Sequence, residues 1–166
     1  TLPASTYHDI NGNMSLAGGL TLGAGLYAVT GYFGAGISGG GDVTCSGTAV
    51  GVTGNGVTIA VAGASKITSG SCSGYVFCIG AGFAHVKINA PTTGTYAYAA
   101  LVGPLDTSNS AGIYITEGAS NTAIGGAVYF PNGPLTMSGG ASIVPASCLQ
   151  IVASQITVSG GTSIKA

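Results

Sequence analysis

Apolar and polar residues alternate over short segments of this chain, and glycines separate these segments. Alternation with a period of two puts successive side chains on opposite faces of an extended strand. Four such segments, rich in β-branched and aromatic residues, are Val57–Val61, Tyr96–Val102, Ile113–Thr116 and Ala127–Phe130. No segment combines a 3.6-residue apolar period with good helix formers and freedom from glycine. The pattern therefore predicts an all-β fold.

The chain also repeats itself. The sequence LTMSGGASI at 135–143 is matched without a gap by ITVSGGTSI at 156–164. The same offset and a similar pattern relate Leu16–Leu22 to Ile37–Val43. Both offsets correspond to a period of about 21 residues, which is typical of a solenoid whose coils each hold three short strands.

We therefore expect a right-handed parallel β-helix with coils of about 21 residues, and a β-sandwich is the alternative. Residues 1–166 would form one solenoid domain, with an irregular or inserted region near 67–126, where strand character persists without the strict offset. Ser-Gly-Gly would occupy one corner of each coil, where glycine allows positive φ. In this fold three pairs should stack as neighbours along the axis: Leu135 with Ile156, Met137 with Val158, and Ile143 with Ile164.

Charge is scarce in this chain and excludes several function classes. There are three lysines, no arginine and four acidic residues among 166 residues, and the net charge is −1. Such a chain lacks the basic surface that nucleic-acid binding needs. Prolines and glycine pairs interrupt the long uncharged stretch 118–164, so no transmembrane helix is expected. Low net charge favours association between copies.

The cysteine count points to disulfides. Four cysteines, Cys45, Cys72, Cys78 and Cys148, have no zinc-type spacing and no second histidine near them. Disulfides imply an oxidising, extracytoplasmic compartment. Residues 1–10 show no signal peptide, so we expect a mature form or an excised piece. We expect Cys72 to pair with Cys78; Cys45 and Cys148 would then be free, joined by a chain that doubles back, or linked between subunits.

The sequence offers no catalytic constellation, no metal site and no cofactor motif. Only Asp106 and Glu117 lie within one coil of each other, and neither has an acid or histidine beside it. The adjacent His8 and Asp9 face opposite ways on a strand and form no dyad. In Phe83–Ile88 the alternation predicts Ala84, Val86 and Ile88 inside, and Phe83, His85 and Lys87 on the surface. We expect the protein not to be an enzyme.

Tyrosines are the one abundant side chain suited to surface contacts. Tyr96 and Tyr98 alternate on one face of a predicted strand. Aromatic packing on a half-buried surface is the simpler interpretation, and a sugar-binding platform is the other. An exposed row of tyrosines would mark a contact surface.

Three segments carry a resemblance to a known family: APTTGTYA at 90–97, GAVYFPNGPLTMSG at 126–139 and SCLQIVA at 147–153. They resemble the C-terminal region of TadG-like bacterial envelope proteins, which are associated with tight-adherence (Flp) pili. The resemblance extends over about residues 50–164 and implies an extracytoplasmic role in adhesion or surface structure, at the cell surface or outside the cell. It implies no catalytic residues.

Two functions are consistent with these expectations. The first is a structural or adhesive surface protein that self-assembles end to end into a homopolymer, with Ile156, Val158 and Ile164 on an uncapped last coil as the assembly end. The second is a ligand-binding β-helix, such as an ice-binding or carbohydrate-binding protein. For ice binding, Thr136 with Thr157, and Ser142 with Ser163, would form hydroxyl ladders with one rung per coil.

Overall fold

The computed structural model describes a defined part of the chain. Backbone positions are described for residues 7–37, 44–45, 48–49, 52–83, 85–116 and 121–164. Within these ranges the side chains of 44–45, 48–49, 52–55, 121, 142 and 144–147 lie outside the description.

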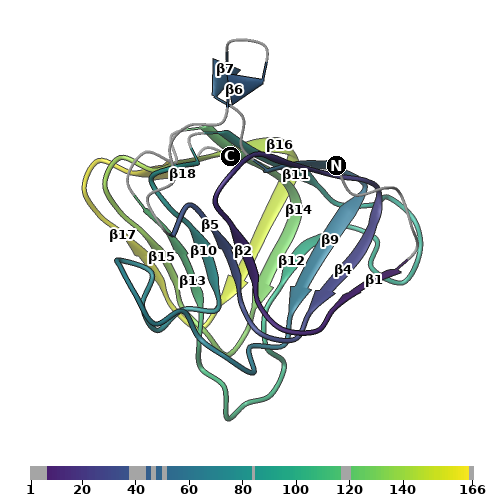
Figure 1. Cartoon of the computed structure of the whole chain (residues 1–166), viewed down its shortest axis with the longest axis horizontal. Helices are drawn as coiled ribbons and strands as arrows, with labels where there is room; N and C mark the ends of the chain where they lie inside the picture. The colour runs from purple at the N-terminus through teal and green to yellow at the C-terminus, as the bar shows by residue number, and fades with distance from the viewer. Residues whose placement is uncertain are drawn as a thin grey trace.

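The described residues form strands and no helices, arranged in two parallel sheets and one short antiparallel pair (Figure 1). The ten-stranded sheet contains β1(Tyr7–Ile10), β3(Leu20–Leu22), β4(Gly25–Val29), β8(Val52–Asn55), β9(Val57–Val61), β11(His85–Asn89), β12(Ala99–Val102), β14(Asn121–Phe130), β16(Ser142–Ala153) and β18(Ser163–Ile164). The six-stranded sheet contains β2(Met14–Leu16), β5(Phe33–Ala35), β10(Phe77–Ile79), β13(Ile113–Ile115), β15(Leu135–Met137) and β17(Ile156–Val158). The antiparallel pair is β6(Thr44–Cys45) and β7(Thr48–Ala49).

Strand order follows chain order in both sheets. The six-stranded sheet runs β2, β5, β10, β13, β15, β17 from one edge to the other. The ten-stranded sheet has two flanks that share β14 and β16. One flank runs β1, β4, β9, β12, β14, and the other β3, β8, β11, β14. Strand β14 pairs with β11 before Gly126 and with β12 after it, and Gly126 has a φ of 116°. Glycine adopts that backbone conformation without a Cβ clash, so the sheet can change direction there.

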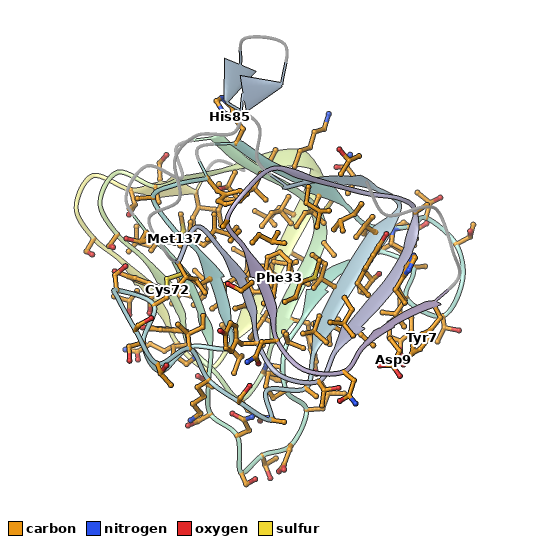
Figure 2. The ribbon with its side chains drawn as sticks, in the orientation of Figure 1. Tyr7, Asp9, Phe33, Cys72, His85 and Met137 are labelled. Atoms are coloured by element: carbon orange, nitrogen blue, oxygen red, sulfur yellow. A yellow bond between two sulfur atoms is a disulfide. The ribbon has the colours of Figure 1, made fainter. Side chains whose placement is uncertain are left out.

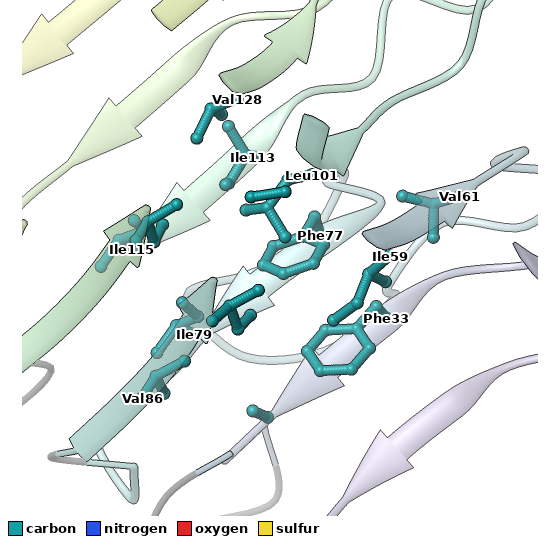
Figure 3. Packing of buried hydrophobic residues seen from close by; sticks show 14 of the residues in the cluster. Phe33, Ile59, Val61, Phe77, Ile79, Val86, Leu101, Ile113, Ile115 and Val128 are labelled. Carbon is teal, nitrogen blue, oxygen red and sulfur yellow. The ribbon is translucent and has the colours of Figure 1, made fainter. Parts of the chain in front are cut away.

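The core is a set of apolar columns, each with one side chain from each strand. In the six-stranded sheet one column runs through Met14, Phe33, Phe77, Ile113 and Leu135, which are all buried. The rings of Phe33 and Phe77 stack with their centroids 4.7 Å apart (Figure 3). Ile59, Leu101 and Val128 approach from the ten-stranded sheet and are also buried. Apolar contact between the two sheets is therefore continuous along the stack.

The predicted stacking at the C-terminal side is confirmed. Leu135 pairs with Ile156, Met137 with Val158, and Ile143 with Ile164, each at the offset of the sequence repeat. The parallel pairing of both sheets does not fit the β-sandwich alternative, whose sheets are antiparallel.

For the rest of the chain, the prediction that paired residues are separated by a constant 21 positions is wrong. Along the six-stranded sheet, paired residues are separated by 19, 44, 36, 22 and 21 positions. Two connections account for part of the excess, 62–76 before β10 and 103–112 before β13. They lengthen a turn outside the sheets and leave the pairing of the strands intact.

The first predicted repeat does not stack as expected. Leu16 pairs with Ala35 rather than Ile37, and Leu22 pairs with Gly54 rather than Val43. Strand β5 ends at Ala35, and Ile37 packs in an outer apolar cluster, where its Cδ1 lies over the backbone of Gly34. A Cβ at Gly34 would collide with the end of the Ile37 side chain, which would then have to move. Residues 38–43 lie outside the described residues.

Two further details of the strand predictions are wrong. Tyr96 and Tyr98 precede β12 in a turn, and Tyr98 has a φ of 65°, so the two tyrosines do not alternate on a strand. Phe83 is buried because β11 begins only at His85, and the alternation therefore does not extend back to it. From His85 onward the alternation is confirmed: Val86 and Ile88 are buried, and His85 and Lys87 are exposed. Ala84 lies outside the described residues.

Candidate functional site

Apolar side chains are exposed at one edge of the two parallel sheets. Strand β17 is the edge of the six-stranded sheet, and its Ile156 and Val158 stand in the same columns as Leu135 and Met137. Leu135 and Met137 are fully buried, whereas Ile156 and Val158 are 49% and 46% exposed. On the ten-stranded sheet, Ile164 pairs with buried Ile143 and is itself half-buried. The three residues predicted as an assembly end therefore lie on the outermost strands of one edge; we call this edge surface the C-edge.

The opposite edge is formed by β1, β2 and β3. Met14 and Leu22 are nearly buried there, and Leu16 and Ile10 are half-buried against the core. We call this edge the N-edge. An edge strand presents backbone N–H and C=O groups that no neighbouring strand satisfies, and this makes it a template for another chain.

A histidine at the N-edge stacks on the core. The ring of His8 lies on Tyr27, with centroids 4.3 Å apart and planes 10° from parallel. The Tyr27 hydroxyl donates a hydrogen bond to the Gly23 carbonyl at 2.8 Å, and burial raises the pKa of this phenol above its usual value of 10.0. Nε2 of His8 is buried and has no hydrogen-bond partner among the described residues. His8 thus packs against Tyr27 at the end of the core and does not form a dyad with Asp9.

Acidic residues come together in a way the sequence did not predict. Asp9 and Asp106 line one surface hollow of about 440 Å³, although they are far apart along the chain. Asp42 and Glu117, the other two acids, lie outside the described residues. Asp106 accepts a hydrogen bond from the Ser108 backbone N–H at 2.9 Å, and the Ser108 backbone and hydroxyl hold the pKa of this carboxyl below 3.8.

The cysteines divide between a bridge and a free thiol. Cys72 and Cys78 form a disulfide with a Cα–Cα distance of 6.0 Å, and this predicted pair is confirmed. The bridge packs on Ile67 outside the six-stranded sheet, in the same outer cluster as Ile37. Cys148 is a free, exposed thiol. The side chain of Cys45 lies outside the described residues, so its state remains a prediction.

The residues of the predicted hydroxyl ladders pair in register. Thr136 pairs with Thr157, and Ser142 with Ser163, as parallel neighbours. The Tyr75 hydroxyl donates to Thr136 Oγ1 at 3.1 Å. The rings of Tyr75 and Tyr114 stack at 5.0 Å over the same face. The threonine ladder therefore has tyrosine rings beside Thr136, and the side chain of Ser142 in the serine ladder lies outside the description.

Among the described residues, no group of three or more His, Cys, Asp and Glu side chains is placed to hold a metal ion. Nor does that part of the chain contain a helix able to cross a membrane. No protein-family model, curated protein or solved structure matches the chain.

Proposed function

We propose that this protein is an extracellular or cell-surface structural protein of the adhesive kind, which assembles end to end with copies of itself into filaments. One observation carries the proposal: Ile156 and Val158 continue two buried columns yet remain about half exposed at the C-edge. Covering these side chains would remove apolar area from water at about 25 cal/mol per Å². At the N-edge the same two columns begin with Met14, which is buried, and Leu16, which is half-buried.

The proposed architecture is a right-handed parallel β-helix. The two flanks of the ten-stranded sheet and the six-stranded sheet all hold parallel strands in chain order, and this supports the proposal. The helix would be right-handed because a parallel crossover in one sheet is right-handed in about 98% of cases. The stacking of 135–143 on 156–164 at the C-edge supports coils of about 21 residues there. In such a helix the N-edge of one copy can add to the C-edge of another with every strand still running parallel.

Location and relationship support the same function. The resemblance to the C-terminal region of TadG-like proteins suggests the bacterial envelope. The Cys72–Cys78 disulfide fits an oxidising compartment. The net charge of −1 gives little repulsion between copies. Under this proposal the protein has no catalytic role, no cofactor and no nucleic-acid partner.

A charge placed on the C-edge tests the assembly. Ile156→Asp puts a carboxylate where the next copy would bury it, and Leu105→Asp adds the same charge to a 66% exposed residue of the connection 103–112, which belongs to none of the edge strands. An uncompensated buried charge costs about 3 kcal/mol or more. The association constant of Ile156→Asp should therefore fall by a factor of about 100. Sedimentation velocity over a concentration series, with electron microscopy and a reducing agent present, measures this.

The outcomes are distinct. Filaments from the unmodified protein and from Leu105→Asp, with monomers from Ile156→Asp, support the proposal. A protein that stays monomeric at every concentration contradicts it, as does assembly that Ile156→Asp leaves unchanged. Circular dichroism of each variant checks that the β-sheet content is preserved.

A further inference from the structure

A groove lies on the outer face of the flank formed by β1, β4, β9 and β12. Pairing register puts Asp9, Ala28, Ala60 and Val102 in one outward-facing row across these strands. Small alanine side chains make the floor, and the hollow above it measures about 440 Å³. Figure 2 shows Tyr7 and Asp9 on the outer side of the ribbon, away from the core around Phe33.

Two tyrosines stand between this hollow and a second one. Tyr7 and Tyr96 line both the first hollow and a neighbouring hollow of about 470 Å³. Both rings are well exposed, Tyr7 at 53% and Tyr96 at 41%. The two hollows with the tyrosines between them are the tyrosine groove. Space on both sides of the same rings suits an extended ligand rather than one compact molecule.

Charge in the tyrosine groove has one sign. Of the residues that the structure describes, Asp9 and Asp106 are the charged side chains that line it, and both are exposed. Hydrogen bonds from Ser108 favour the ionised form of Asp106. Aromatic faces beside carboxylates attract ammonium groups through cation–π and charge interactions. An acidic polysaccharide would be repelled.

Over the inner strands of the groove the backbone argues against a peptide ligand. Strand β4 lies between β1 and β9, and β9 lies between β4 and β12, so their N–H and C=O groups are engaged in the sheet. A peptide bound over β4 and β9 would lose the partners of its own main chain, and only the free side of the edge strand β1 could pair with it. A saccharide has hydroxyls along its sides instead, and exposed Thr93 and Thr95 offer hydroxyl partners in the second hollow.

We propose that the tyrosine groove binds an extended oligosaccharide of amino sugars with protonated amino groups. Sugar rings lie against Tyr7 and Tyr96, and ammonium groups bind near Asp9 and Asp106. This inference goes beyond self-assembly, because the groove opens on the outer face of the sheet, whereas end-to-end contact uses its edges. Strand β1 belongs to both, since it supplies Tyr7 and Asp9 to the groove and is also a strand of the N-edge.

Isothermal titration with three probes tests the ligand class. A glucosamine hexamer should bind, and its fully N-acetylated counterpart should bind at least about tenfold more weakly because it has lost its charge. Spermine supplies amines without sugar rings and should also bind at least about tenfold more weakly. No binding of the glucosamine hexamer overturns the proposal. Equal affinity for the acetylated hexamer or for spermine overturns it too.

Substitutions test the location. Asp9→Asn with Asp106→Asn, and separately Tyr96→Ala, should each weaken binding of the glucosamine hexamer by about tenfold or more. Tyr129→Ala is the matched control, because Tyr129 is 40% exposed and lines neither hollow. Unchanged affinity in the groove variants, or an equal loss in Tyr129→Ala, overturns the proposal. These residues are exposed, so the fold should tolerate the changes, and thermal melts check that it does.

Measuring the Ile156→Asp variant separates the two proposals. Its affinity for the hexamer should equal that of the unmodified protein. A protein that assembles but does not bind the hexamer refutes the groove alone, and one that binds but does not assemble refutes the assembly alone.

Discussion

Leu135 and Ile156 are adjacent in one column, and their truncation to alanine should have very different effects on stability. Leu135 is fully buried, so Leu135→Ala removes its transfer free energy and leaves a cavity, at a cost of about 2–5 kcal/mol. Ile156 is 49% exposed and lies on the outermost strand. Full burial of such a side chain is worth about 1.5–3 kcal/mol, so the half-buried Ile156 contributes about 1 kcal/mol, with no closed cavity.

Urea unfolding of dilute, monomeric protein measures both values. With a slope of about 2 kcal/mol per molar urea, the midpoints of the two variants should differ by about 0.5–2 M. Equal midpoints, or a larger loss in Ile156→Ala, would refute the view that β17 is an open edge. Repeating the titration at high protein concentration adds a second check, because a covered Ile156 should then cost more to truncate.

Further predictions concern single groups. The pKa of buried Tyr27 is raised, so its phenol ionises at lower pH in the unfolded state than in the folded state. The unfolding free energy should therefore fall as pH rises above about 10. Thermal melts of Tyr27→Phe at alkaline pH should show a smaller fall. Ser108→Ala removes the hydroxyl but keeps the backbone N–H, which is the larger cause of the lowered pKa, so an NMR titration should show the pKa of Asp106 rising only part of the way toward 3.8. In the unmodified protein the small stability gain from this carboxylate is present above 3.8 and is lost as pH falls through the lowered pKa. If Cys148 links subunits, non-reducing electrophoresis should show multimers that Cys148→Ser abolishes, whereas a monomer band in both means that filaments depend on edge contacts alone.

Sequence alone predicted the strand pairing where both sheets pair residues at the same separation along the chain. The repeat at 135–143 and 156–164 predicted the register of three stacked pairs, because no insertion separates the two copies. The short spacing of Cys72 and Cys78 likewise predicted their bridge.

Where long connections separate paired strands, the repeat length did not predict the pairing. Residue separations of 44 and 36 across single strand pairs cannot be found from a fixed period. Ile37 fits the repeat in sequence, yet it packs outside the sheet on Gly34. Asp9 and Asp106 line one hollow only because β1 and the connection 103–112 meet on the same flank, and no local pattern in the sequence records that contact.

Every pairing within the two large sheets is parallel, and this gives the molecule a direction. Its two edges are different surfaces, so two copies that met through the same edge would have to pair their strands antiparallel. Copies related by translation along the stack keep the parallel register, and such a contact does not close on itself. A filament built this way is polar: one of its ends always presents β1, β2 and β3, and the other β16, β17 and β18. Growth at the two ends should therefore proceed at different rates, and a ligand that caps one edge would stop growth at that end only.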